Sequence, residues 1–142
     1  MSTDLQSTNT PNAILYTMVR VQDFGLSLQF YRDALGMREV QRETFTDAKF
    51  ALVFVGYADS DALIELTFNW GENTYSHGTG YGHIALEVQD IARVVSYLAE
   101  RGVEIARAPG PMKMAPDGTT EREIIAFVMD PDGYRIELIQ AL

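Results

Sequence analysis

Two glutamates and one histidine are the residues of this 142-residue chain whose types and positions point to chemistry. Glu65 and Glu137 each lie inside a short apolar segment typical of a strand, where a carboxylate is costly unless it is paired or binds a metal. With His83 they make a ligand set for a divalent ion of Ni, Zn, Co, Mn or Fe, with positions left for water and substrate. A lone glutamate or histidine on an alternating strand is more often exposed or structural, so the metal interpretation depends on the joint pattern.

An internal repeat supplies that joint pattern. Residues 15–23 are similar to residues 82–90, and residues 63–66 are similar to residues 135–138. The first similarity pairs Tyr16 with His83, and the second pairs Glu65 with Glu137. Self-similarity of this kind indicates two copies of one supersecondary unit. If a pseudo-two-fold axis relates the copies, the four side chains can converge on one cavity floored by sheet.

Each copy is expected to form a β-α-β-β-β unit, which makes the fold class α+β. The expected strands are 14–21, 37–43, 49–57 and 62–69 in the first copy, and 81–88, 103–107, 123–129 and 134–141 in the second. The helices are expected between Asp23 and Gly36 and between Asp90 and Gly102, because aspartate caps helix starts and glycine ends helices.

The repeats, residues 14–69 and 81–140, are expected to form one domain over residues 13–142. Residues 70–80 are rich in Gly, Asn, Ser and Thr and link the two repeats. Residues 108–122 carry three of the five prolines and are expected to form a long loop.

Composition excludes several kinds of protein. The formal net charge of −9, from 20 acidic and 11 basic residues, argues against nucleic acid and anionic membranes as partners. The absence of cysteine excludes disulfides, thiolate metal sites and a cysteine nucleophile. Residues 1–12 are polar and lack the features of a secretory signal, and no run approaches membrane-spanning length. We therefore expect a soluble cytoplasmic protein with a flexible leader over residues 1–12.

Over nearly all of residues 14–140, the chain resembles the glyoxalase I family of the vicinal oxygen chelate superfamily. The segments that carry the resemblance are residues 26–31 with 35–37, 54–57, 64–70, 81–86 and 125–138. The Asp-Pro-Asp-Gly turn at 130–133 is common across the superfamily, whereas Glu-Leu-Thr-Phe-Asn-Trp at 65–70 and Tyr-Gly-His-Ile-Ala at 81–85 are closer to glyoxalase I. The resemblance implies that the two repeats form an open, curved mixed sheet around a shared cavity.

The resemblance also implies a metal held by His, Glu, His and Glu, one residue near each end of each repeat. Three of these ligands carry over onto Glu65, His83 and Glu137. Where the family has the first histidine, this chain has Tyr16. Ni or Zn is the metal expected first, with Co, Mn and Fe as alternatives.

Tyr16 is open to four interpretations. It binds the metal as phenolate, it hydrogen-bonds a water that replaces the missing ligand, the metal is lost and the cavity serves another purpose, or the ring only fills space. A neutral tyrosine, whose pKa is about 10, is a poor ligand unless the metal removes its proton.

The implied reaction converts the hemithioacetal of glutathione and methylglyoxal to S-lactoylglutathione. The metal acts as a Lewis acid for the enediolate, while a carboxylate moves a proton from the carbon that bears sulfur to the adjacent carbon. The family pattern makes Glu137 the base, with Glu65 on the other side of the site. Tyr16 is the third catalytic candidate.

Four further residues match positions that bind the charged ends of glutathione in the family. Arg20 and Asn69 match the residues at the glutamyl end, and Lys113 matches the lysine near the glycine carboxylate, with Arg107 as a weaker candidate. In bacterial members, first-half ligands of one subunit meet second-half ligands of its partner. The resemblance therefore implies a homodimer with two sites at the interface.

Two other functions stay open. A relative that kept the glutathione pocket could use Tyr16 as an acid or base on another thiol adduct or electrophile. A non-catalytic protein could bind a small ligand, although it would have no use for two buried carboxylates.

Overall fold

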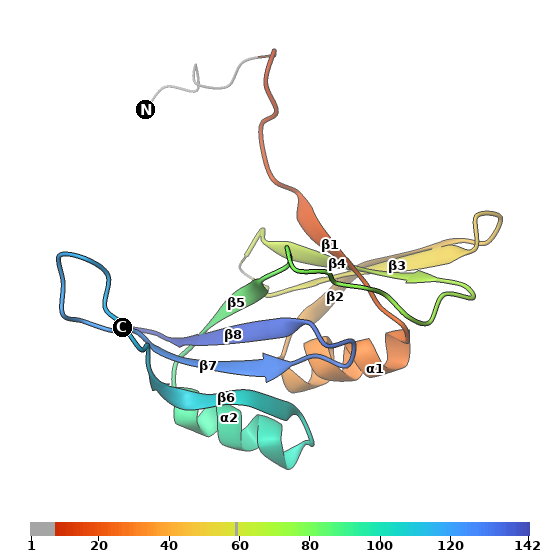
Figure 1. Cartoon of the computed structure of the whole chain (residues 1–142). Coiled ribbons are helices and arrows are strands. Elements are labelled where there is room, and N and C mark those ends of the chain that lie inside the picture. The colour runs from red at the N-terminus through yellow and green to blue at the C-terminus, as the bar shows by residue number, and fades with distance from the viewer. Residues whose placement is uncertain (1–7, 59) are drawn as a thin grey trace.

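The computed structural model describes residues 8–58 and 60–142 and consists of two four-stranded sheets with helices packed against them (Figure 1). The first half contains β1 (Tyr16–Arg20), α1 (Phe24–Leu28), η2 (Gln29–Ala34), β2 (Arg38–Phe45), β3 (Phe50–Gly56) and β4 (Leu63–Asn69). The second half contains β5 (His83–Val88), α2 (Ile91–Glu100), β6 (Glu104–Pro111), β7 (Ile124–Met129) and β8 (Arg135–Gln140). The predicted α+β class is confirmed.

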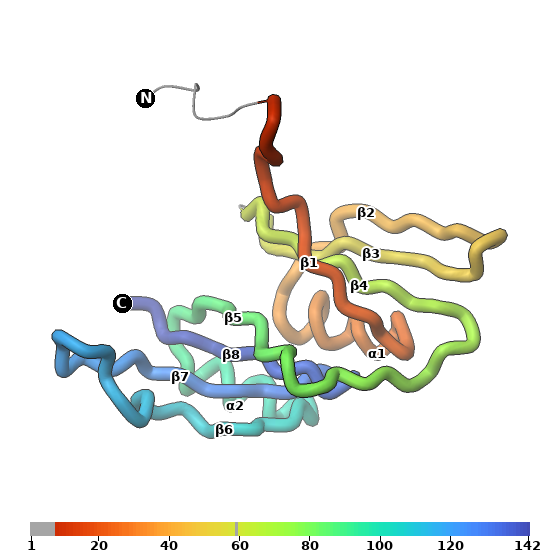
Figure 2. The backbone as a smooth tube through the Cα atoms, turned by 45° about the horizontal axis from the view of Figure 1, so that its top comes forward, coloured from red at the N-terminus to blue at the C-terminus, as the bar shows by residue number. Residues whose placement is uncertain are grey.

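Both sheets have the same topology. The strand order is β1-β4-β3-β2 in the first sheet and β5-β8-β7-β6 in the second. In each sheet the first strand pairs in parallel with the last, and the other pairs are antiparallel. The helical segment of each half therefore connects the two edge strands of its sheet. Figure 2 shows the sheets in separate parts of the molecule, joined by the segment that follows β4.

The helices begin and end at the predicted residues. The side chain of Asp23 accepts a hydrogen bond from the backbone of Leu26, and Asp90 accepts one from Arg93. Gly36 and Gly102 end the helical segments with φ of 77° and 84°, a conformation that costs glycine little. The first segment differs from expectation in its geometry, because only α1 is an α-helix and η2 is a wider π-helix.

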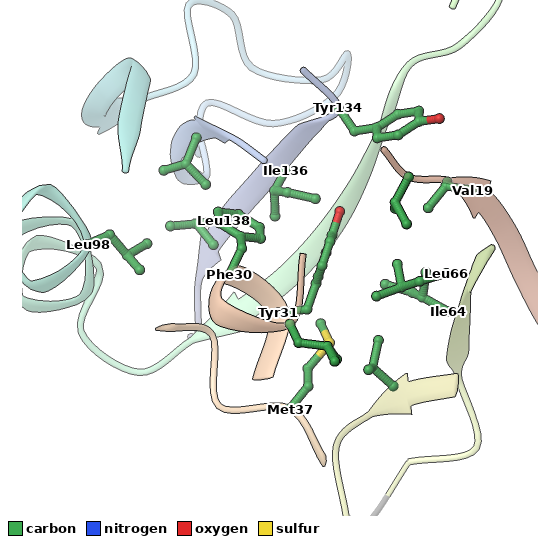
Figure 3. Close-up of a cluster of buried hydrophobic side chains, with 14 of the residues drawn as sticks. Val19, Phe30, Tyr31, Met37, Ile64, Leu66, Leu98, Tyr134, Ile136 and Leu138 are labelled. Carbon is green, nitrogen blue, oxygen red and sulfur yellow. The ribbon is translucent and has the colours of Figure 1, made fainter. Parts of the chain in front are cut away.

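The hydrophobic core lies on the face of each sheet that the helices cover. Helix α2 contributes Ile91, Val95 and Leu98, which are spaced so that they share one side of the helix. Buried residues of both halves belong to one cluster, in which Leu66 comes from β4 and Ile136 from β8 (Figure 3). The halves therefore share one core although their sheets are separate.

A buried polar contact joins the halves inside this core. The Tyr31 hydroxyl of η2 donates to Asp130 Oδ2 at 2.6 Å, and Asp130 is only 5% exposed. The backbone N–H groups of Asp132 and Tyr134 donate to Asp130 Oδ1 at 2.9 and 2.8 Å. The same turn receives the backbone N–H of Gln22, which donates to Asp132 Oδ1 at 2.9 Å. The turn between β7 and β8 is thus bonded to the first half through both Asp130 and Asp132.

Replacing Tyr31 by phenylalanine is expected to lower the free energy of unfolding by about 2 kcal/mol at neutral pH, because buried Asp130 loses a donor. Burial and the Asp130 carboxylate raise the pKa of Tyr31 well above its unfolded value of about 10. The stability that this shift contributes is fully present below about pH 10 and is lost as the pH rises towards the folded-state pKa. Urea unfolding from neutral to alkaline pH should show a smaller alkaline loss in the variant.

The matched control for this variant is Tyr97→Phe, because Tyr97 is exposed on α2. Its neutral and alkaline stability should follow the wild type. An alkaline loss in Tyr31→Phe as large as that of the wild type would contradict the assignment.

Strand β6 is longer than the sequence predicted. It runs to Pro111, so residues 108–111 belong to the sheet and the predicted loop over 108–122 is wrong at its start. The prolines at 109 and 111 are tolerated because β6 is an edge strand, and its register with β7 shifts twice. The loop that remains is closed by the backbone N–H of Met112, which donates to the carbonyl of Glu123 at 2.8 Å.

The predicted leader over residues 1–12 lies partly outside the described residues, which begin at residue 8. Within residues 8–58 and 60–142, no helix has the length and apolar character needed to cross a membrane.

Candidate functional site

In the first sheet, Tyr16 and Glu65 share the face that points away from the helices. Tyr16 and Met18 lie on the side of β1 opposite to the buried Val19, and Met18 is in register with Glu65 on β4. Glu65 is 7% exposed, and its carboxylate accepts a hydrogen bond from the Thr67 hydroxyl. The Tyr16 ring is 43% exposed and meets Phe54 edge-on, with ring centroids 4.9 Å apart. A buried carboxylate and an accessible phenol therefore lie on this face.

In the second sheet, His83 and Glu137 are in direct contact. Glu137 on β8 is in register with Ala85 on β5, which lies two residues after His83. His83 Nε2 is 3.0 Å from Glu137 Oε1, and the His83 side chain is 42% exposed. The His83 ring meets the Phe127 ring edge-on, with ring centroids 5.3 Å apart. The Arg135 guanidinium lies over the Phe127 ring. This pair combines an accessible imidazole with a largely buried carboxylate.

The two pairs occupy equivalent places in the repeated fold. Tyr16 lies two residues before Met18, which is in register with Glu65 on the neighbouring strand. In the same way, His83 lies two residues before Ala85, which is in register with Glu137. Phe54 is in register with Glu65, and Phe127 is in register with Glu137. The sequence repeat pairs the four polar residues, but the two phenylalanines lie outside the repeated segments, and reasoning from the sequence assigned them no role.

The two pairs do not form one cluster within a single chain. In the described part of the chain, no three His, Cys, Asp or Glu side chains lie close enough to hold a metal together. The predicted convergence of all four residues on one cavity is therefore not observed within this chain. Each sheet instead carries one half-site: Tyr16 and Glu65 on the first, His83 and Glu137 on the second.

The candidate glutathione-binding residues are also divided between the halves. Arg20 Nη1 donates to Asn69 Oδ1 at 2.9 Å, so these two residues lie together at the ends of β1 and β4. Arg107 Nη1 donates to the carbonyls of Gly110 and Ile125, and its Nη2 donates to the carbonyl of Pro111. These bonds hold the irregular part of β6. Lys113 is exposed in the loop that follows β6.

A cavity of about 440 Å³ beside Arg20 was not anticipated from the sequence. Its lining includes Arg20, His77, Tyr81 and Tyr134. The His77 and Tyr134 rings are stacked, with centroids 4.1 Å apart. Burial raises the pKa of Tyr134, and its hydroxyl donates to the Arg20 carbonyl at 2.9 Å. In the sequence, this cavity is signalled by aromatic residues of the linker over residues 70–80 and by Tyr134, which follows the turn at 130–133.

The repeated β-α-β-β-β units and their half-sites define a class of protein, the vicinal oxygen chelate fold. Residues 13–138 match the family described as the Glyoxalase/Bleomycin resistance protein/Dioxygenase superfamily. The chain belongs to this superfamily, and the predicted fold is confirmed.

Within this superfamily, the chain is similar to lactoylglutathione lyases and to glyoxalase I. The chain is 50% identical to a probable lactoylglutathione lyase of Synechocystis sp. over 129 residues, which cover 89% of this chain and 94% of that protein. It is 46% identical to the lactoylglutathione lyase of Haemophilus influenzae, over 89% of this chain and 91% of that protein. The crystal structure of glyoxalase I from Zea mays matches 89% of this chain with a TM-score of 0.79 and 32% identity. This chain spans 44% of the length of the maize chain.

Proposed function

We propose that the chain is a glyoxalase I type enzyme, which isomerises the hemithioacetal of glutathione and methylglyoxal to S-lactoylglutathione. The observation that carries the proposal is the pair of glutamates at equivalent strand positions, one beside His83 and the other beside Tyr16, on the fold of lactoylglutathione lyases. We also propose that it acts in the cytoplasm.

We propose that two chains complete each site. Because the half-sites lie on separate sheets of one chain, Glu65 and Tyr16 of one subunit would meet His83 and Glu137 of a second. A symmetric homodimer then holds two such sites. The exposed rings of Tyr16 and His83 are accessible for this pairing.

The donor set fits a divalent metal. Glu65, Glu137 and His83 supply two carboxylates and one imidazole, and the contact between His83 and Glu137 shows that two donors already lie together. We propose these three residues and the Tyr16 oxygen as the ligands. When bound, a divalent metal would supply the Lewis acid that stabilises negative charge on the two neighbouring oxygens of the substrate.

The chain's own contribution is proton transfer. We propose that a Glu137 carboxylate oxygen takes the proton from the carbon that bears sulfur and delivers it to the adjacent carbon, so the reaction consumes no net proton. Glu65 lies on the other side of the site, where its carboxylate is held by Thr67. The Phe54 ring packs edge-on against Tyr16, and the Phe127 ring packs edge-on against His83.

The basic residues are proposed to bind the two ends of glutathione. Arg20, held by Asn69 and by the bond from Tyr134 to its carbonyl, is proposed to bind the glutamyl end. Lys113 is proposed for the glycine carboxylate, and Arg107 remains the weaker candidate because backbone carbonyls already engage both of its terminal nitrogens.

Replacing Arg20 by methionine is expected to raise KM for the hemithioacetal about 10- to 100-fold with a smaller change in kcat, because a charged hydrogen bond to the substrate is lost. Steady-state kinetics measure the effect. Arg93→Met, at an exposed position on α2, should match the wild type. A KM unchanged by Arg20→Met would remove Arg20 from the binding site.

The experiment that tests the proposed function is the hemithioacetal isomerase assay. It is run on metal-stripped protein and again after addition of Ni²⁺, Co²⁺, Mn²⁺ or Zn²⁺ in turn. The expected result is turnover that a metal restores. No turnover with any metal, together with glutathione binding, would overturn the assignment and favour another thiol adduct or a binding role.

A further inference from the structure

We infer that Tyr16 makes the two halves of the site chemically unequal, and that this inequality shifts the metal selectivity of the chain towards oxygen-preferring ions such as Mn²⁺. The inference rests on the proposed function, because it concerns the same metal site. It follows from the internal repeat of this chain, in which one half presents nitrogen at a position where the other presents oxygen.

The two rings occupy matching positions. Tyr16 and His83 stand at the starts of the parallel edge strands β1 and β5, two residues before the residue in register with a glutamate. The Tyr16 ring meets Phe54 at an interplanar angle of 67°, and the His83 ring meets Phe127 at 78°. Both residues are accessible, with Tyr16 43% exposed and the side chain of His83 42% exposed. The fold therefore presents either ring to the site in the same way.

The donors that these rings carry differ in chemical preference. The second half offers one nitrogen and one carboxylate, whereas the first half offers only oxygen, from Tyr16 and Glu65. Imidazole suits Zn²⁺ and Ni²⁺, whereas oxygen ligands suit Mn²⁺. A site with three oxygen donors and one nitrogen donor should therefore discriminate less strongly against Mn²⁺ than a site with two histidines. A water held by the Tyr16 hydroxyl would have the same effect, because the atom facing the metal is again oxygen.

The test compares the metal affinities of wild-type protein and Tyr16→His. Metal-stripped samples are titrated with Mn²⁺, Ni²⁺ and Zn²⁺ by isothermal calorimetry. Tyr16→His is expected to lower Kd for Ni²⁺ and Zn²⁺ by about tenfold or more, with a clearly smaller change for Mn²⁺. Tyr97→His is the control, because it adds an exposed histidine on α2 away from the site and should leave all three affinities unchanged.

A spectroscopic measurement tests the role of the Tyr16 oxygen directly. Fe³⁺-loaded wild-type protein is expected to show a phenolate charge-transfer band in the visible region, which Tyr16→Phe lacks. If Tyr16 acts through a water, the band is absent, but the difference in metal selectivity remains and supports the inference.

The outcomes separate this inference from the proposed function. Equal ratios of Mn²⁺ to Ni²⁺ affinity in wild type and Tyr16→His would overturn the inference, while metal-restored isomerase activity would leave the proposed function standing. Failure of both proteins to bind any metal would overturn both.

Discussion

Replacing Glu137 by glutamine is expected to reduce isomerase turnover by about 100- to 10,000-fold, the range that general acid–base catalysis contributes. Glutamine has nearly the same shape but cannot accept the substrate proton. The substitution also removes the carboxylate whose Oε1 lies 3.0 Å from His83 Nε2. The measurement is kcat at saturating hemithioacetal with the restoring metal present.

Metal content must be measured in the same samples, because Glu137 is also a proposed ligand. A variant that retains metal and loses turnover supports the role of base, whereas loss of both assigns Glu137 mainly to metal binding. Glu104→Gln is the matched control, since Glu104 is an exposed carboxylate at the start of β6. Near wild-type turnover in Glu137→Gln would exclude Glu137 as the base.

Mixing two inactive variants is expected to restore activity. Glu65→Gln damages only the first half-site, and Glu137→Gln damages only the second. In a mixed dimer, one site combines both defects and the other combines two intact halves. Random assortment makes about half of the dimers mixed, so co-refolded protein should reach about a quarter of wild-type activity.

The control for this experiment is each variant refolded alone, which should stay inactive. A second control mixes the single variant Glu65→Gln with a double variant that carries both Glu65→Gln and Glu137→Gln. This mixture should also stay inactive, because no site then has two intact halves. If the first mixture shows no recovery while forming mixed dimers, the sites are not shared between subunits. Native mass spectrometry of the mixture establishes whether mixed dimers formed.

Local features of the fold could be predicted from the sequence because short-range chemistry determines them. Asp23 and Asp90 cap helices through bonds that span three residues, and Asp130 to Gly133 form the predicted turn. Short apolar segments likewise placed Glu65 and Glu137 within strands β4 and β8. The errors at the start of the 108–122 loop arose because an edge strand tolerates prolines that would break a central one.

The arrangement of the candidate site was less predictable, because it depends on how distant elements pack. The repeat paired Tyr16 with His83, but only the tertiary structure shows that these residues lie on separate sheets. The hydrogen bonds of Arg107 could not be predicted from the sequence for the same reason. Its terminal nitrogens bind carbonyls that become available where the β6 register shifts, and no local sequence pattern specifies that shift.

The Tyr31 to Asp130 contact has a consequence for the spacing of the two half-sites. Apolar surfaces alone can pack in several relative orientations at similar free energy, because dispersion contacts have little directionality. A buried carboxylate is satisfied only in an orientation that brings its donor within hydrogen-bond distance, and here that donor comes from the other half of the chain. The angle and distance between the two sheets are therefore selected by a polar contact in the core as well as by apolar packing.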